Sequence, residues 1–266
     1  MKSKQTGALP LITVAMPIYN AGEYLPDAVN SIIAQTYTNW ELFIIDDGST
    51  DNAINSVESI KDARIKILND GLNKGLAARL NQAIDLAKGQ YFARMDQDDI
   101  SMPERFKMQL DALEADLSLD VVAVCALKIN SKSKIVGKLP SALTHQQICA
   151  KPWRGFYMPH PTWLGRIEWF RKHRYASPAP YLCEDQELLL RSYKVSQFKC
   201  VAQALLHYRV RDKINLVKSI KTRWAVLNCQ LKVFKCKEVG FNCLAIISFA
   251  LRVFEDVFIK LTEFKK

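Results

Sequence analysis

The chain has 266 residues, 49% of them hydrophobic, and a formal net charge of +10. This length and apolar content suit one large domain, or one domain with an appendage, and no repeat or low-complexity tract points to a fibrous or disordered protein. The seven cysteines include no Cys-x-x-Cys pair, which predicts reduced thiols in a cytosolic protein and no zinc site. Residues 1–10 lack the apolar segment of a signal peptide, so we expect no export.

Apolar runs and helical patterns alternate along the first half of the chain. The predicted strands are residues 11–16, 42–45, 65–68, 91–93 and 121–127. The predicted helices are residues 23–35, 52–60, a segment opening at the turn 70–75 and continuing to about 87, and 103–115. The last helix is preceded by the box Ser101-x-x-Glu104, which is typical of a capped helix start. The alternation predicts an α/β fold with a parallel sheet covered by helices on both faces.

Two acidic turns follow two of these strands. Residues 46–51 are Asp-Asp-Gly-Ser-Thr-Asp, and residues 94–99 are Arg-Met-Asp-Gln-Asp-Asp. In open α/β sheets, ligands bind outside the carboxyl ends of the strands. Crowded carboxylates at that edge favour a Mg²⁺ or Mn²⁺ ion that shares its coordination shell with substrate phosphates and waters. For residues 94–99 taken alone, the alternative is a solvated acidic turn that caps the next helix.

Aromatic residues are frequent in the second half. The loop 157–163 is rich in aromatic residues and proline, a composition that often shapes a pocket. Trp153, Trp163 and Trp169 suit the apolar faces of sugar rings, and each of them suits the core equally well.

Glu184 and Asp185 open a predicted helix that runs to about Arg191. Carboxylates in the first turn of a helix are kept ionised by the helix dipole and by free N–H groups. An ionised, oriented carboxylate is what general-base catalysis on a hydroxyl requires. The alternative is a helix cap accompanied by an i,i+4 pair between Glu187 and Arg191.

Almost all of the net charge belongs to the last quarter of the chain. From Lys199 onward there are 14 Lys and Arg residues against 5 Asp and Glu residues. Residues 239–251 are uncharged and largely apolar, but a bilayer span needs about 20 such residues. A basic segment joined to an amphipathic helix predicts binding to an anionic membrane surface. The alternatives are a helix that packs on the domain and, below both, nucleic acid, for which no binding motif is present.

Six ordered motifs resemble those of glycosyltransferase family 2, which has the GT-A fold. They lie at residues 14–20, 40–51, 73–76, 96–105, 160–162 and 184–185. The resemblance covers about residues 11–210 and is with bacterial members. It implies a GT-A domain at 1–210, with a Rossmann-like nucleotide-binding half and a mostly parallel sheet at 11–127 and an acceptor half at 128–210. Residues 211–266 then form a basic, amphipathic C-terminal helical region outside the resemblance. It also implies inverting transfer of a sugar, from a UDP-sugar by preference, to a saccharide or lipid-linked acceptor with Mn²⁺ or Mg²⁺.

The resemblance also assigns roles to residues of the donor site. Pro17 and Tyr19 would line the nucleotide pocket, and Asp47 would bind the edge of a uracil-like base. Lys74 stands where the family contacts the nucleotide.

Further roles concern the metal and the base. Asp96 would face the ribose or the metal shell, Asp98 would bind the metal, and Asp185 would deprotonate the acceptor hydroxyl. The sequence departs from the family where a His often stands two residues after a Tyr-Arg pair, because Arg211 stands at that position. An arginine cannot bind a cation but can hold diphosphate oxygens.

Three function classes follow. The preferred one is a sugar transferase at the cytoplasmic face of the cell membrane that builds a cell-surface polysaccharide or lipopolysaccharide. A nucleotidyltransferase that makes an activated sugar would be expected to have a Gly-rich, basic phosphate loop after the first strand, and residues 17–22 contain no Lys or Arg. The third class is a non-catalytic binding domain, which the intact Asp98 and Asp185 argue against.

Overall fold

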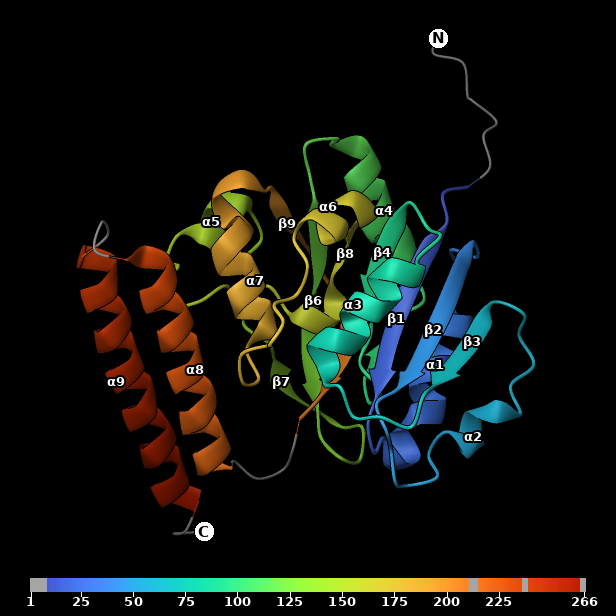
Figure 1. Cartoon of the computed structure of the whole chain (residues 1–266), viewed down its shortest axis with the longest axis horizontal. Helices are drawn as coiled ribbons and strands as arrows, with labels where there is room; N and C mark the ends of the chain where they lie inside the picture. The colour runs from blue at the N-terminus through green and yellow to red at the C-terminus, as the bar shows by residue number, and fades with distance from the viewer. Residues whose placement is uncertain (1–8, 211–214, 236–238, 264–266) are drawn as a thin grey trace.

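The structure is a computed structural model that describes residues 9–210, 215–235 and 239–263 (Figure 1). The strands are β1 (Ile12–Ile18), β2 (Trp40–Asp46), β3 (Ile65–Asn69), β4 (Tyr91–Arg94), β5 (Ile100–Ser101), β6 (Val121–Ile129), β7 (Ile135–Lys138), β8 (Leu164–Arg166) and β9 (Phe198–Arg209). The helices are α1 (Leu25–Ile33), α2 (Asn55–Glu58), α3 (Leu76–Leu86), α4 (Arg105–Ala115), α5 (His145–Cys149), α6 (Ile167–Lys172), α7 (Glu184–Ser192), α8 (Leu216–Phe234) and α9 (Val239–Glu263).

One mixed sheet holds these strands in the order β3-β2-β1-β4-β8-β6-β9-β5, with β7 beside β6. The first four strands of this order are all parallel, as the alternation of strands and helices predicts. The neighbouring β8 is antiparallel to both β4 and β6, while β6 and β9 are parallel. The predicted α/β fold class is therefore confirmed, and its N-terminal half has the Rossmann-like order.

Alternate residues of each central strand face opposite sides of the sheet. Val14 and Ile44 pack with α1 and α4 on one face, whereas Ala15 and Phe43 pack with α3 and α6 on the other. The central strands β1, β2 and β4 are buried along their whole length, so their sequences are largely apolar, whereas β3 and β7 are partly exposed. Burial ends at Gly48 in the turn after β2 and at Asp96 in the turn after β4.

The predicted capping box at Ser101 is wrong. Helix α4 has Glu104 as its N-cap residue and receives no side-chain cap bond. Ser101 lies instead in β5, where its hydroxyl accepts a hydrogen bond from Gln35 Nε2 at 3.1 Å. The short strand β5 pairs with the end of β9, which draws Ser101 away from the helix.

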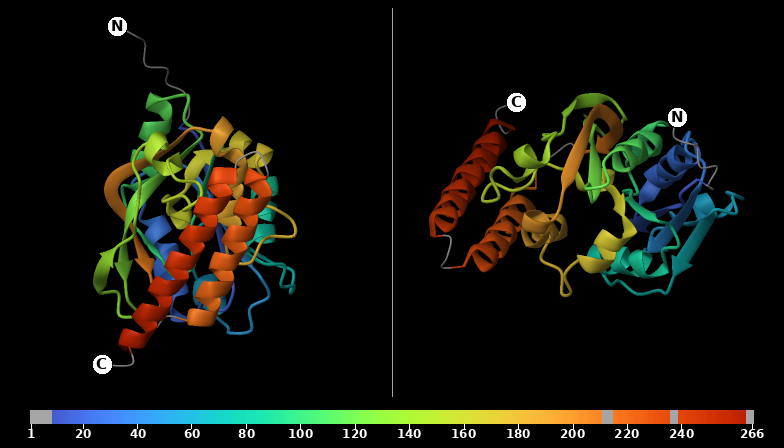
Figure 2. Two further views of the ribbon diagram at one scale, coloured as in Figure 1. Left: turned by 90° about the vertical axis from the view of Figure 1, so that its left-hand side faces the viewer. Right: turned by 90° about the horizontal axis from the view of Figure 1, so that it is seen from above.

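Helices α8 and α9 form an antiparallel pair at one side of the molecule, red and orange in Figure 2. We call this pair the C-terminal hairpin. Gln230 of α8 donates to the Pro152 carbonyl at 2.9 Å, and Phe241 of α9 lies 4.9 Å from Trp153, centroid to centroid. Arg223 binds the buried Asp256 through two nitrogens, at 2.5 and 2.6 Å, and so holds the two helices together. The hairpin thus packs on the domain, which was one of the two alternatives for this region.

Candidate active site

The carboxyl ends of β1, β2 and β4 meet at one edge of the sheet. A cavity of about 220 Å³ at this edge brings together five of the residues singled out from the sequence. They are Pro17, Tyr19, Asp47, Asp96 and Asp98. The two acidic turns therefore contribute to one site, because parallel neighbouring strands end at the same edge.

Asp47 is buried and holds the loop that precedes α3. Its carboxylate accepts hydrogen bonds from the backbone N–H groups of Lys74 and Gly75, and from Arg79 Nε at 2.8 Å. Gly48 makes this approach possible, because a Cβ at that position would meet the backbone of Leu72 at 3.1 Å. Asp47 thereby serves as the link between β2 and the loop at one wall of the cavity.

Lys74 lies in the loop that Asp47 holds, and its contact with a nucleotide stays a prediction. Its ammonium group pairs with Asp70 at 2.7 Å, and only its backbone N–H is bonded to Asp47. The buried cation between Asp47 and Asp70 is Arg79, which was not identified from the sequence. Arg79 is 1% exposed and bridges Asp47 and Asp70. An arginine inside a helical pattern looks like a surface residue, so only the two aspartates around it could have indicated its burial.

We expect Arg79→Met to destabilise the protein by about 3 kcal/mol, because it leaves Asp47 buried without its charged partner. The loop at residues 70–75 should also loosen and weaken binding at the cavity. Chemical denaturation monitored by circular dichroism measures the first effect. Lys107→Met, which breaks an exposed pair with Asp111, is the control and should change stability very little. Equal stability of the two variants would contradict the bridging role.

Tyr19 borders the cavity with an exposed ring, 49% accessible. Its backbone is fixed by Gln97, whose side chain accepts from Tyr19 N–H and donates to the Tyr19 carbonyl. The β1 loop and the acidic turn after β4 are therefore joined by a reciprocal pair of bonds.

The three carboxylates of the turn after β4 have different partners. Asp96 pairs with the buried Arg94 at 2.6 Å. Asp99 accepts from the backbone N–H of Arg209, at 2.9 Å, while its other carboxylate oxygen is buried without a partner among the described residues. Arg209 Nε also donates to the Asp98 carbonyl at 2.9 Å. The end of β9 therefore clamps the turn and leaves the Asp98 carboxylate facing the cavity.

The Asp98 carboxylate fits a cation. Burial, together with the neighbouring charge of Asp96, raises the pKa of Asp98 to about 6, so its charge is poorly compensated by the protein. Hard oxygen donors next to open space suit Mg²⁺ or Mn²⁺. Asp98 borders this cavity and also a larger one that extends toward the C-terminal hairpin.

A second acidic group lies at the start of α7. Ligand atoms of His160, Glu184 and Asp185 lie within 4.8 Å of one another, and the His160 Nδ1 to Glu184 Oε1 distance is 3.7 Å. His160 Nε2 is 2.7 Å from the Tyr175 hydroxyl. Burial raises the pKa of Asp185, opposite to the lowering that a place in the first helix turn predicts, because the loss of solvent outweighs the bonds from backbone N–H groups. Burial also lowers the pKa of His160 well below its usual value, so the imidazole is neutral. A raised carboxyl pKa suits a proton acceptor.

Arg94 connects the two acidic groups. It is 3% exposed, and its charge acts on Glu184 and Asp185 as well as on its partner Asp96. Two of its nitrogens, Nε and Nη1, are buried without a partner in the described part of the chain. The charge of this guanidinium group acts on His160 and Glu184 at one end and on Asp98 at the other. No pattern in the sequence indicates that Arg94 is buried.

Other residues highlighted by the sequence have distinct locations. Trp163 and Trp169 belong to the core, whereas Trp153 lines the larger cavity. Arg211 lies outside the described residues, so its role stays a prediction. The roles of the other site residues, including Asp185 as base, also stay predictions.

Comparisons with known proteins agree on the family. A family model described as Glycosyl transferase family 2 matches residues 13–174. An uncharacterized glycosyltransferase of Haemophilus influenzae is 34% identical over 219 residues, which cover 76% of this chain and 66% of that protein. WfgD of Escherichia coli, a UDP-Glc:alpha-D-GlcNAc-diphosphoundecaprenol beta-1,3-glucosyltransferase, is 34% identical over 141 residues, or 52% of this chain and 54% of WfgD.

Solved structures show the same fold. S. aureus TarS in complex with UDP-GlcNAc matches with a TM-score of 0.66 at 17% identity, over 88% of this chain and 70% of that one. The mannosyltransferase PcManGT of Pyrobaculum calidifontis, in complex with GDP-Man and Mn²⁺, matches with a TM-score of 0.61 at 14% identity, over 96% of this chain and 79% of that one. With the matched model covering more than half of its length, the chain belongs to glycosyltransferase family 2.

Proposed function

We propose that the protein transfers a sugar from a nucleotide-diphospho-sugar, with a UDP-sugar preferred, to a hydroxyl of a saccharide or lipid-linked acceptor, with inversion. The observation that carries this proposal is the cavity in which Asp47, Asp96 and Asp98 meet, with the charge of Asp96 acting on Glu184 at the start of α7. The complex of TarS with UDP-GlcNAc supports a UDP-sugar as the donor. WfgD, a UDP-Glc:alpha-D-GlcNAc-diphosphoundecaprenol beta-1,3-glucosyltransferase, supports a lipid-linked acceptor. The product would belong to a cell-surface polysaccharide or lipopolysaccharide.

The donor would lie along the edge formed by β1, β2 and β4. Pro17 and Tyr19 would flank the base, while Asp47 and the loop at Lys74 would form the opposite wall. Asp98 would hold a Mn²⁺ or Mg²⁺ ion, which when bound neutralises charge on the leaving diphosphate. PcManGT, whose complex contains Mn²⁺, supports this choice of ion.

The acceptor hydroxyl would approach from the side of α7. Asp185 would take its proton while the hydroxyl oxygen bonds to the anomeric carbon and the bond from that carbon to the diphosphate breaks. Gln186 positions this carboxylate, because its Nε2 lies 3.1 Å from Asp185 Oδ2 and its side chain is also bonded to the backbone of Phe156. Attack from the face opposite the leaving group gives inversion.

Ligand-induced thermal stabilisation tests the donor proposal. The purified chain is heated with a panel of nucleotide-sugars, with and without Mn²⁺. We expect one donor to raise the melting temperature only when Mn²⁺ is present. Equal stabilisation with and without the metal would contradict the proposed site at Asp98.

We further propose that α9 rests on the cytoplasmic face of the cell membrane. Its outward side carries six exposed apolar residues at helical spacing, which we call the α9 stripe: Leu244, Ile247, Leu251, Phe254, Phe258 and Leu261. Lys232 and Lys235 are exposed at the turn end of the hairpin, and each such charge is worth about 1 kcal/mol near an anionic leaflet. Within the described residues, no helix combines the length and apolar content needed to cross a bilayer.

Replacing both Phe254 and Phe258 by serine should release the protein from phosphatidylglycerol vesicles. The two rings are 70% and 59% exposed, so their loss should leave the fold intact while lowering vesicle affinity by about tenfold for each ring. Vesicle sedimentation measures this effect, and high salt should weaken the binding of the parent as well. Leu117→Ser, at a residue 75% exposed elsewhere, is the control. The membrane proposal fails if the parent protein does not bind the vesicles. It also fails if the substitutions only dissociate a dimer, because the α9 stripe would then pack against a second copy of the chain.

A further inference from the structure

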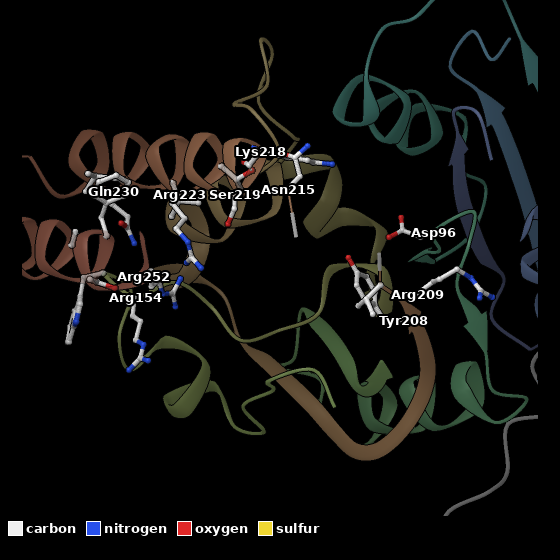
Figure 3. A pocket seen from close by; sticks show the side chains of 18 of the residues that line it. Asp96, Arg154, Tyr208, Arg209, Asn215, Lys218, Ser219, Arg223, Gln230 and Arg252 are labelled. Carbon is white, nitrogen blue, oxygen red and sulfur yellow. Dashed lines mark hydrogen bonds between the residues drawn. The ribbon is translucent and has the colours of Figure 1, made fainter. Parts of the chain in front are cut away.

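A cavity of about 620 Å³ lies between the C-terminal hairpin and the catalytic domain (Figure 3). One end is lined by Asp96 and Asp98, together with Tyr208 and Arg209 at the end of β9. The other end is lined by α8, α9 and the segment around Trp153. The cavity is of the size that holds small-molecule ligands. It connects the part of the site at Asp98 to the C-terminal hairpin, which has no role in the proposed binding of the donor.

The hairpin end of this cavity is basic. Its lining contains Arg154, Lys218, Arg223 and Arg252, and the lining carboxylates, Asp96 and Asp98, belong to the opposite end. Figure 3 shows the side chains of Arg223 and Arg252 extending from the two helices into the same space. A cavity lined in this way attracts an anion.

The cations are positioned by the fold. Arg223 uses Nε and Nη2 to bind Asp256, which leaves Nη1 for a ligand. Arg252 Nη2 donates to the Tyr157 hydroxyl at 2.9 Å, which fixes the guanidinium against the catalytic domain. In the described part of the chain, the side chain of Lys218 has no hydrogen-bond or ion-pair partner, although its backbone N–H is capped by Asn215. Guanidinium groups held in place lose little entropy when they bind phosphate oxygens.

From this arrangement we propose that the hairpin end of the cavity, formed by Arg252, Lys218 and Arg223, is a subsite for the phosphate groups of the acceptor. This inference rests on the proposed function, because it specifies the acceptor as a sugar carried on a phosphate or diphosphate. With its phosphates between α8 and α9, such an acceptor would direct its sugar along the cavity toward Asp98. Its lipid would leave the cavity on the side of the hairpin, which also bears the α9 stripe.

Inorganic pyrophosphate is the probe for this subsite. Calorimetric titration of the protein in EDTA removes the contribution of any metal bound at Asp98. We expect the parent to bind pyrophosphate, and Arg252→Gln and Lys218→Gln each to bind it about tenfold more weakly or worse, because a hydrogen bond to a charged group is lost. Arg252→Lys, which keeps the charge, should retain most of the affinity. Lys221→Gln is the matched control on an exposed position of α8 that does not line the cavity, and should bind like the parent.

Two further readouts assign the source of the phosphate and separate this inference from the proposed function. Arg252→Gln should still sediment with phosphatidylglycerol vesicles, whereas its loss from them would make the subsite a site for bulk lipid headgroups and overturn the proposal. Stabilisation by the donor with Mn²⁺ should be the same in Arg252→Gln and the parent. If the parent lacks that stabilisation, the donor proposal fails while the pyrophosphate result still stands. Equal pyrophosphate binding by parent and variants would overturn the subsite alone.

Discussion

Asp98→Ala is expected to abolish sugar transfer and leave the fold intact. The Asp98 carboxylate borders the donor cavity and has a pKa raised to about 6, so at pH 7 the folded state holds a charge that burial disfavours. Removing that charge should leave the free energy of unfolding at pH 7 unchanged or increased. Donor binding should become weak and independent of metal, because the side chain that joins the cation to the diphosphate is gone.

Radiolabelled transfer assays and donor-induced thermal stabilisation measure the two effects separately. Asp111→Ala, which removes an exposed carboxylate on α4, is the control and should behave like the parent. Substantial Mn²⁺-stimulated transfer by Asp98→Ala would show that another residue holds the metal. The group of His160, Glu184 and Asp185 would then be the next candidate.

Asp185→Asn should reduce transfer by about 10²- to 10⁴-fold while donor binding survives. The substitution keeps the shape of the side chain and removes its ability to accept a proton. The half-buried position and raised pKa of Asp185 support this role, as does the neutral His160 nearby. The rate of a single turnover, measured with donor and enzyme at saturating concentrations, reports the chemical step directly.

Glu184→Gln is the matched comparison, because Glu184 is the adjacent carboxylate of the same helix turn. We expect a smaller loss from it, through its contact with His160. A rate for Asp185→Asn within a few-fold of the parent would return Asp185 to the role of a helix cap. A larger loss for Glu184→Gln than for Asp185→Asn would transfer the role of base to Glu184.

The N-terminal half could be predicted because its local and tertiary signals agree. Ile44 and Ile45 are buried on opposite faces of the sheet, so the apolar run of β2 continues to Asp46, the last residue of the strand. The same holds for β4 and the turn that contains Asp98. The acidic turns were therefore visible as abrupt changes of composition, and their meeting at one edge followed from the parallel order.

The buried arginines could not be predicted in this way. Arg79 and Arg105 lie in helices, where a lone arginine looks like a solvated residue, and Arg94 ends a strand. Arg79 and Arg105 have partners that are distant in sequence: Arg79 binds Asp47, 32 positions away, and Arg105 donates to the Pro161 carbonyl, 56 positions away. Burial of such a group is decided by partners that only the folded chain brings together.

The C-terminal hairpin was predicted in part. The periodic residues of the predicted helix do lie in α9, but they divide between two sides: Phe241 packs against Trp153, whereas Ile247 and Phe254 are exposed. Periodicity identifies the helix but cannot tell which apolar side finds a partner. Packing on the domain and an exposed apolar side therefore coexist, although the sequence presented them as alternatives.

The clamp of Arg209 on the acidic turn determines when in folding that turn can be completed. Asp99 and Arg209 are separated by 110 positions in sequence, and β5 beside them finds its sheet partner only in β9. Closing so long a loop costs entropy before any contact repays it. During synthesis, the N-terminal strands can pair as soon as they emerge, but the turn that carries Asp98 stays without its clamp until β9 joins the sheet. A fragment that ends before β9 would contain the acidic turn without the strand that holds it in place.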